Sequence, residues 1–279
     1  MARIRVVTDS ASDLPQEYAH SLDIDVVSLT IRFGDEEFTD RVDLTPEEFW
    51  AKCKSSKTLP ETAAPSPGAF QAAYERAKAD GYDGVLVLTL SSLLSATHQS
   101  ASLAGEAVAG TIEVRVIDTL SVSMGQGLIA IDLAESAKGG ADLDQLAARA
   151  DELMNKGGVV ATLNTLEHLI KGGRIGGAKA LLGQVLSIKP LVELKGGVVA
   201  EAGRQRTRAK ALSAVANAAA SHAPLRRLAL IHGACNDVAT LQELIKDIPT
   251  EFPVVLTDIG PVVGAHGGPG IIGLTWIGA

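Results

Sequence analysis

The chain has 279 residues, which is long for one ordinary domain, so we expect two domains that share a cleft. Hydrophobic residues make up 46% of the sequence but aromatic residues only 4%, so small aliphatic side chains must form the core, as is typical of α/β proteins. A net charge of −8 disfavours nucleic acids and anionic membrane surfaces as partners.

The sequence shows no pattern of membrane insertion, secretion or metal binding. No apolar run approaches the roughly 18 residues needed to cross a bilayer, and the first residues lack the apolar core of a signal peptide. Cys53 and Cys235 lie far apart without a neighbouring histidine pair, so we interpret both as reduced packing residues. We therefore expect a cytoplasmic protein that holds no metal and no cofactor.

Short apolar runs alternate with helical patterns in the first half of the chain. We expect strands over residues 3–8, 25–33, 84–90 and 114–120. This rhythm predicts a parallel sheet with crossover helices. In the second run apolar and polar residues alternate, which predicts an edge strand with one solvated face. A helix is expected around residues 70–77, after a proline-containing start segment.

The second half has a different pattern. Residues 191–194 and 198–200 flank Lys195-Gly196-Gly197, which predicts a hairpin and hence a mixed or antiparallel sheet. Further strands are expected over residues 159–163, 228–232, 254–257 and 271–277, with an alanine-rich helix over 209–220. Gly157 and Gly158 break the pattern. We therefore expect an N-terminal α/β domain over residues 1–157 and a C-terminal α/β domain over residues 158–279.

The segment from Thr89 to Ala101 is the most suggestive chemically, because a strand ends there in hydroxyl residues and a helix follows. Free N–H groups at a helix start can hold an anion. Ser95 can add its hydroxyl, while Ala96 and Thr97 offer backbone N–H groups, which suits a carboxylate better than a triphosphate. An ordinary N-capping serine would give the same pattern, so both interpretations stay open.

Two other residues are candidates for holding a polar ligand group. Thr62 precedes two prolines in residues 61–67, and their fixed φ angles can hold its hydroxyl in place, although most such loops are simple turns. His266 lies in the glycine-rich residues 264–270, where backbone can approach a ligand closely. A lone histidine in such a loop can equally be structural or solvated.

Two glycine-rich stretches resemble nucleotide-binding motifs, and both fail on context. Residues 171–179 have Ala178 before Lys179 and another alanine after it, so they lack the contiguous Gly-Lys-Ser/Thr of a phosphate loop. Residues 268–273 match Gly-x-Gly-x-x-Gly, but the sequence ends six residues later, without the helix and strand of a dinucleotide fold. We find no nucleotide-binding motif in the sequence.

Six segments occur in an order that is specific in combination: residues 7–14, 62–66, 91–101, 116–121, 171–175 and 266–270. Together they resemble the DegV family of bacterial proteins over nearly the whole chain. The resemblance implies two α/β domains that enclose a long-chain fatty acid, of the palmitate or oleate class, in a slot between them. It also implies that Thr62, Ser95 and Ala96 meet the carboxylate and that His266 lies near this head group.

The same segments contain further cleft candidates, namely Asp9, Ser10, Ser121, Arg174 and Gly267. Some family members are lipid-binding subunits of a bacterial fatty acid kinase. The resemblance therefore implies that this protein catalyses nothing alone and presents the carboxylate to a separate ATP-binding kinase. The missing nucleotide motif agrees with that division of labour.

A basic cluster over residues 203–210 is a candidate docking site for this kinase. Arg206 matches the family's kinase-contacting arginine. If the stretch is extended, Arg204, Arg206 and Arg208 point to one side of it. The alternative is a solvated basic run that leads into the following helix.

Two other functions stay open. A phosphotransferase or hydrolase acting alone would use His266 and Asp9 across the domain cleft, although the order of residues assembles no Ser/His/Asp triad. A lipid-sensing binding protein would share the slot but need no kinase.

Overall fold

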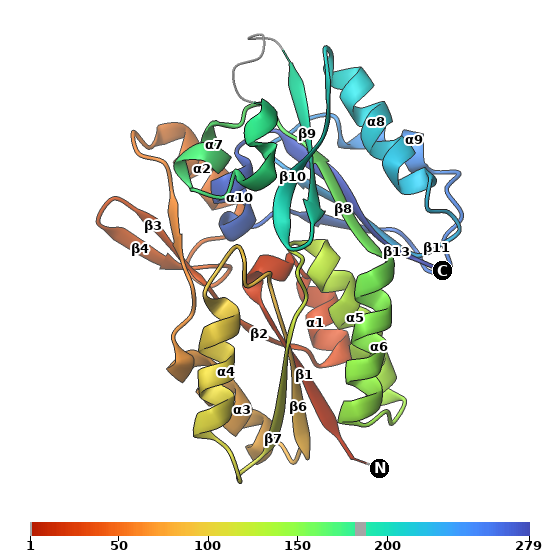
Figure 1. Ribbon diagram of the computed structural model, residues 1–279. Coiled ribbons are helices and arrows are strands. Elements are labelled where there is room, and N and C mark those ends of the chain that lie inside the picture. Colours follow the sequence, from red (N-terminus) through yellow and green to blue (C-terminus); the bar gives the residue numbers. More distant parts are fainter. Residues whose placement is uncertain (1, 182–187) are drawn as a thin grey trace.

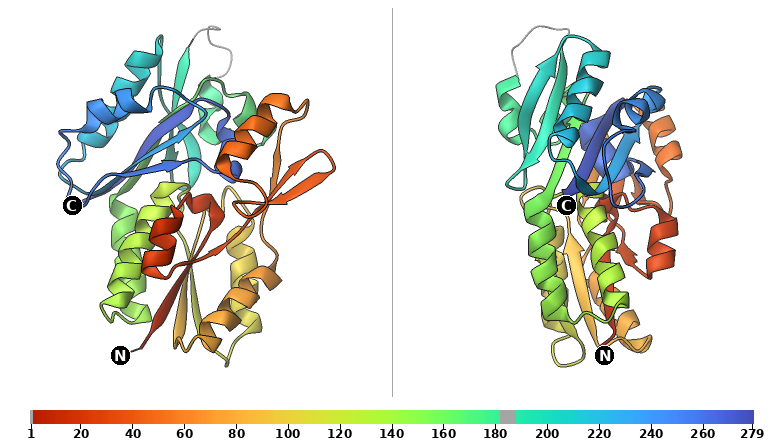
Figure 2. Two further views of the ribbon diagram at one scale, coloured as in Figure 1. Left: turned by 180° about the vertical axis from the view of Figure 1, so that it is seen from behind. Right: turned by 90° about the vertical axis from the view of Figure 1, so that its right-hand side faces the viewer.

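The computed structural model describes residues 2–181 and 188–279, and it is an α/β fold with two domains, as predicted (Figure 1). A parallel four-stranded sheet has the order β2-β1-β6-β7. A mixed six-stranded sheet has the order β10-β9-β8-β13-β11-β12, and a small antiparallel sheet has the order β4-β3-β5. The two larger sheets lie one above the other, and the small sheet lies to one side (Figures 1 and 2).

Helices cover both faces of the parallel sheet. Its strands are β1 (Ile4–Asp9), β2 (Asp25–Val27), β6 (Gly84–Thr89) and β7 (Glu113–Asp118). The helices are α1 (Gln16–Leu22), α3 (Pro67–Ala79), α4 (Thr97–Ala107), α5 (Met124–Lys138) and α6 (Leu143–Lys156). In β6, Val85 and Val87 pack with α3 and α4, whereas Leu86 and Leu88 pack with α5 and α6. Burial on both faces explains the continuous apolar run of this strand.

The strand predicted over residues 25–33 is wrong as a single element. The chain forms β2 at the edge of the parallel sheet and then β3 (Thr30–Phe33) in the small sheet, between β4 (Glu36–Thr39) and β5 (Glu61–Ala63). At the break the Leu29 N–H donates to the Ser10 hydroxyl at 3.0 Å, and the Leu29 carbonyl accepts from Asp40 N–H at 2.9 Å. These bonds take the place of a ladder to β1, so the strand leaves the parallel sheet.

The small sheet and α2 (Pro46–Ser55) reach across to the C-terminal half of the chain. Phe49 and Trp50 of α2 are buried against α10 (Pro261–Gly267). A Cβ atom at Gly264 would lie only 2.7 Å from the Phe49 ring, so glycine permits this close approach. The N-terminal half therefore holds the helix that carries His266.

The second large sheet is mixed, as predicted, because β11 pairs with β12 in parallel and its other pairs are antiparallel. Its strands are β8 (Gly157–Thr162), β9 (Lys189–Lys195), β10 (Val198–Gln205), β11 (Leu225–Gly233), β12 (Val255–Asp258) and β13 (Ile271–Gly278). Helices α8 (Arg208–Ala220) and α9 (Val238–Ile245) cover one face, and α7 (Glu167–Lys171) lies near α10. Along the chain, β8 is the first strand of this sheet, and it begins at Gly157.

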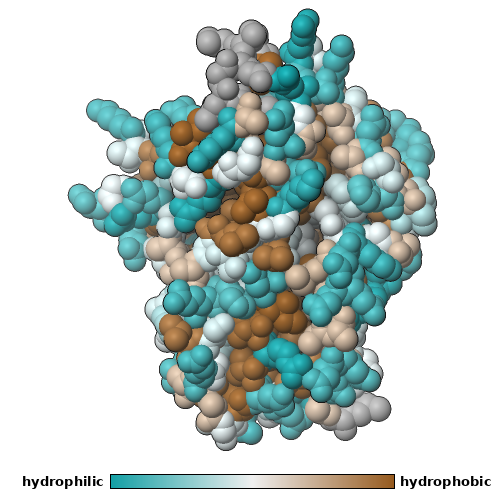
Figure 3. All heavy atoms as spheres, in the orientation of Figure 1, coloured by the Kyte–Doolittle hydropathy of each residue, from teal (hydrophilic) through white to brown (hydrophobic). Residues whose placement is uncertain are grey.

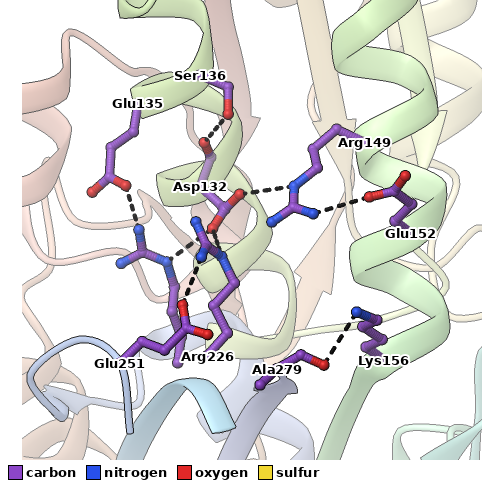
Figure 4. Close-up of polar contacts among 10 residues, drawn as sticks. Asp132, Glu135, Ser136, Arg149, Glu152, Lys156, Arg226, Glu251 and Ala279 are labelled. Atoms are coloured by element: carbon purple, nitrogen blue, oxygen red, sulfur yellow. Dashed lines mark hydrogen bonds and ion pairs between the residues drawn. The ribbon is translucent and has the colours of Figure 1, made fainter.

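A cluster of ion pairs between α5, α6 and β11 ties the two domains together. The buried Asp132 of α5 pairs with Arg149 of α6 at 3.2 Å and with Arg226 of β11 at 2.6 Å (Figure 4). It also pairs with Arg227 of β11 at 3.3 Å. One carboxylate thus joins two helices of the N-terminal domain to a central strand of the other.

Candidate ligand-binding slot

A cavity of about 230 Å³ lies between the six-stranded sheet and the N-terminal domain. The sheet contributes alternate residues, because neighbouring positions on a strand point to opposite faces. They are Val159, Ala161 and Leu163 at β8, Val192 and Leu194 on β9, Val199 on β10, Ile231 on β11 and Ile271 on β13. The other wall contains Leu29, Leu90, Leu94 and Val122. We call this cavity the slot.

The register of the sheet shows how its face forms one side of the slot. Ala161 lies opposite Val192 on β9 and opposite Gly273 on β13. Gly273 in turn lies opposite Ile231 on β11. Three lining residues therefore come from one row that crosses four strands, and the small side chain of Ala161 lies in the middle of that row.

Polar groups from several elements line this otherwise apolar slot. Thr62 comes from β5, Ser95 and Ala96 from the loop that starts α4, Arg174 from the loop after α7, and His266 and Gly267 from α10. Among the described residues that line the slot, Arg174 alone carries a permanent charge. A ligand with one anionic end and an apolar body matches this distribution.

Thr62 and His266 are in direct contact, although 204 residues separate them in sequence. The Thr62 hydroxyl lies 3.0 Å from Nε2 of His266. The Nδ1 atom of His266 is buried and has no hydrogen-bond partner within residues 2–181 and 188–279. Burial, with the positive charges of Arg174 and His168 adding to it, lowers the pKa of His266 to about 4.

At neutral pH the His266 ring is therefore neutral, with one N–H group and one acceptor nitrogen. If its Nε2 carries the proton, the ring donates to the Thr62 oxygen, and the Thr62 O–H group is left to donate to a ligand oxygen. His168 supports this helix from α7, because its Nδ1 lies 3.1 Å from the carbonyl oxygen of Ala265. The arrangement orients a hydroxyl, and the His266 ring that holds it is neutral.

Ser95 closes the turn that leads into α4. Its hydroxyl accepts from the Thr97 N–H at 3.3 Å and lies 2.9 Å from the Thr97 hydroxyl, while Ala96 is the N-cap residue. The Arg174 side chain holds the same loop by donating from Nε to the carbonyl of Leu94 at 3.1 Å. Ser95 is therefore not the N-cap that the sequence left open, but its hydroxyl bonds the first helical residue and it lines the slot.

Three of the predicted cleft residues lie outside the slot lining. Asp9 is buried, and it accepts hydrogen bonds from the Leu90 N–H at 2.8 Å and from the Gln126 amide at 3.1 Å. Ser10 accepts from Leu29, as described above. Ser121 lines a neighbouring cavity instead. The side chains of Asp9 and Ser10 thus hold backbone next to the slot.

The predicted row of three arginines is wrong. Extended backbone ends at Gln205, and Thr207 caps α8 by accepting from the Lys210 N–H. Arg208 is therefore the first helical residue, and its Nε donates to Asp237 at 2.6 Å. Arg204 and Arg206 remain exposed beside the β9–β10 hairpin.

The sequence did not identify most of the apolar lining. Val159, Ala161 and Leu163 alternate within a predicted strand, but the pattern does not say which face of a buried sheet borders a cavity. Ser123 was missed as well. It lines the slot, but its hydroxyl donates to Asp13 at 2.5 Å.

The described part of the chain contains no helix long and apolar enough to span a membrane. Within residues 2–181 and 188–279 there is also no group of three His, Cys, Asp or Glu side chains that could bind a metal ion.

Comparison with known proteins finds relatives that match over the full length. A DegV domain-containing protein of Listeria monocytogenes is 33% identical over 280 residues, covering 98% of each chain. A Thermus thermophilus structure titled as fatty acid binding of a DegV family protein has a TM-score of 0.91 at 34% identity, covering 99% of this chain and 100% of that one. A Eubacterium ventriosum protein described as stearic acid-binding has a TM-score of 0.87 at 26% identity, covering 99% and 98%.

The family profile described as "Uncharacterised protein, DegV family" matches residues 3–279. The Thermus thermophilus structure agrees with this fold over nearly the whole chain. The chain belongs to the DegV family.

Proposed function

We propose that this protein binds one long-chain fatty acid in the slot and presents its carboxylate to a separate ATP-dependent kinase in the cytoplasm. The observation that carries the proposal is an apolar slot in which Thr62 contacts His266 and the charge of Arg174 acts on the same histidine. The fatty acid-binding descriptions of the Thermus and Eubacterium proteins support the same ligand class.

The carboxylate binds near Thr62, Ser95 and Ala96 in this proposal, with His266 orienting the Thr62 hydroxyl and Arg174 supplying positive charge. Burying about fifteen methylenes at roughly 0.8 kcal/mol each gives a gross driving force of about 12 kcal/mol, before several kcal/mol of association costs. A hydrogen bond to a carboxylate contributes only about 1.5–3 kcal/mol. The tail therefore sets the affinity, and the polar residues set the position of the head group.

Protein purified from a bacterial host should release a near-stoichiometric fatty acid on organic extraction, and Ala161→Trp should abolish this retention. Ala161 is 5% exposed and lies in the middle of the slot row. An indole there displaces at least four methylenes, so oleate affinity should fall by about 100-fold or more. Mass spectrometry of the extract and oleate titration measure the two effects.

Ala202→Trp is the matched control, because it adds the same ring at an exposed position of β10. It should bind oleate like the unmodified protein. A protein that yields no lipid and takes up neither oleate nor palmitate would contradict the proposed function.

Two variants should affect presentation of the carboxylate to the kinase more than retention of the lipid. Ser95→Ala should reduce kinase-coupled acyl phosphate formation steeply while oleate affinity falls by no more than about tenfold.

Arg206→Ala should leave oleate binding intact and slow turnover of the kinase. The salt dependence of this turnover should be weaker than for the unmodified protein, because Arg206 steers docking in this proposal. Turnover with the kinase from the same bacterium, assayed across ionic strength, measures both effects.

Two outcomes would contradict these roles. Arg206→Ala protein that supports the kinase at the normal rate at every salt concentration would make the exposed arginine a solvated surface residue only. Acyl phosphate formed from ATP and oleate by this protein alone would replace the carrier function with catalysis in the cleft.

A further inference from the structure

A second cavity of about 310 Å³ lies next to the slot and shares two wall residues with it. Val159 and Leu194 line both cavities. The second cavity also borders the tip of the β9–β10 hairpin and the start of α5. Hydrophobic side chains gather around this hairpin in the middle of the face shown in Figure 3.

Val159 and Leu194 are neighbours across two strands. Val160 pairs with Glu193 and Ala161 with Val192, so the next step of the same register places Val159 opposite Leu194. Directly opposite side chains have Cβ atoms about 5 Å apart, which allows them to form a continuous wall.

The Val159 side chain also packs directly on helix α5. A Cβ atom built on Gly125 would lie 2.5 Å from Cγ2 of Val159 and 2.3 Å from the Ser121 hydroxyl. Val159 therefore reaches from the sheet to the helix backbone, and the glycine gives it the room to do so. Val159 and Leu194 are the two side chains that line both the slot and the second cavity.

The shared wall lies away from His266. A Cβ atom at Gly267, beside His266, would lie 2.5 Å from Ile271, and one further step of the β8–β13 register places Ile271 opposite Leu163. Val159 lies four residues before Leu163, or about 13 Å along an extended strand. A fatty acid whose carboxylate lies near His266 would thus run toward Val159 with its methyl end.

We propose that Val159 and Leu194 set the upper limit of acyl chain length, and that the cavity behind them is a latent subsite for the methyl end of longer chains. This inference rests on the proposed fatty acid binding. The walls of the second cavity include Ile129, Leu120 and Met154, so an extra methylene would meet apolar as well as polar groups there. Truncating either wall residue joins the two spaces, and enlarging one shortens the slot.

The test is a competition among saturated fatty acids from myristate to behenate in equimolar mixture, with the bound fraction identified by mass spectrometry. Val159→Ala and Leu194→Ala should each raise the arachidate-to-palmitate ratio at least about tenfold over the unmodified protein, the ratio expected for burying two further methylenes. Val159→Phe should move the preference the other way, lowering the stearate-to-myristate ratio by a similar factor.

Val160→Ala is the matched control, because it removes the same two methyl groups from the next residue, which packs on the opposite face of the sheet. It should leave the ratios unchanged. If both truncations also leave them unchanged while the unmodified protein binds palmitate, Val159 and Leu194 do not limit chain length. If the unmodified protein binds no fatty acid at all, the proposed function itself fails, so the two failures are distinguishable.

Discussion

Replacing Asp132 by alanine should lower the free energy of unfolding by about 3–5 kcal/mol. The Asp132 side chain is 1% exposed and binds Arg149, Arg226 and Arg227 (Figure 4). Removing it leaves three guanidinium groups without their shared acceptor. The Arg227 side chain is only 5% exposed, so its charge cannot regain full hydration.

The remaining carboxylates cannot replace Asp132. Glu152, Glu251 and Glu135 are ion-paired with Arg149, Arg226 and Arg227, but their side chains are 63%, 48% and 37% exposed, so none of them is a buried acceptor. Phe252 lies under Arg227, with the guanidinium carbon 4.0 Å from the ring centre, and this contact keeps the arginine in place. The charge therefore stays buried after the substitution.

Urea unfolding, followed by far-UV circular dichroism, measures the decrease in the free energy of unfolding. Because Asp132 joins α5 to β11, its removal should also broaden the transition or split it in two, as the domains unfold less cooperatively. Glu152→Ala removes an exposed partner of the same cluster and should cost less than about 1 kcal/mol. An equally small loss for Asp132→Ala would mean that the cluster contributes nothing to holding the domains together.

This cluster also shows where sequence reasoning ends. Apolar runs and glycine turns predicted the parallel sheet and the β9–β10 hairpin, because burial on two faces and positive φ angles at Gly196 and Gly197 leave local patterns. The pairing of Asp132 with Arg226 leaves no local sequence pattern, since 94 residues separate them. Such contacts depend on how the two domains dock.

In the candidate site, too, some features could be predicted from the sequence and others needed the structure. Thr62 and His266 were singled out together only through the family resemblance, and their contact joins β5 to α10. Strand β5 itself was not predicted, because three residues that include Glu61 and Thr62 carry no hydrophobic alternation. The wall formed by Val159 and Leu194 needed the strand register, which no local pattern supplies.

Asp40→Asn should stabilise the protein by about 3–4 kcal/mol above pH 7 and have little effect near pH 4. The Asp40 side chain is fully buried, and a hydrogen bond from the Ser10 hydroxyl lowers its pKa less than burial raises it. Burial raises its pKa from 3.8 to about 7, and the negative charges of Asp13 and Asp9 add to this rise. Arg41 offsets it only in part, because its guanidinium also binds Asp13 at 2.9 Å.

The direction of the pH dependence follows from this raised pKa. The folded protein holds the Asp40 proton more tightly than the unfolded chain, so the contribution of Asp40 to stability is complete below about pH 4 and is lost as pH rises through about 7. Asparagine keeps the shape of the side chain and stays neutral, so the variant avoids that loss. The gap between the two proteins should therefore widen from pH 4 to about pH 7 and change little above that.

Urea unfolding at a series of pH values between 4 and 8 measures this gap. Burial also raises the pKa of Asp9 to about 7. The free energy of unfolding of the variant should therefore still fall as the pH rises, but by less than that of the unmodified protein. Asp35→Asn, at an exposed position of the β3–β4 turn, makes the same change in charge and should shift stability by no more than about 0.5 kcal/mol. If Asp40→Asn is less stable than the unmodified protein at pH 8, the ionised carboxylate is well compensated by Arg41, and burial does not dominate at this position.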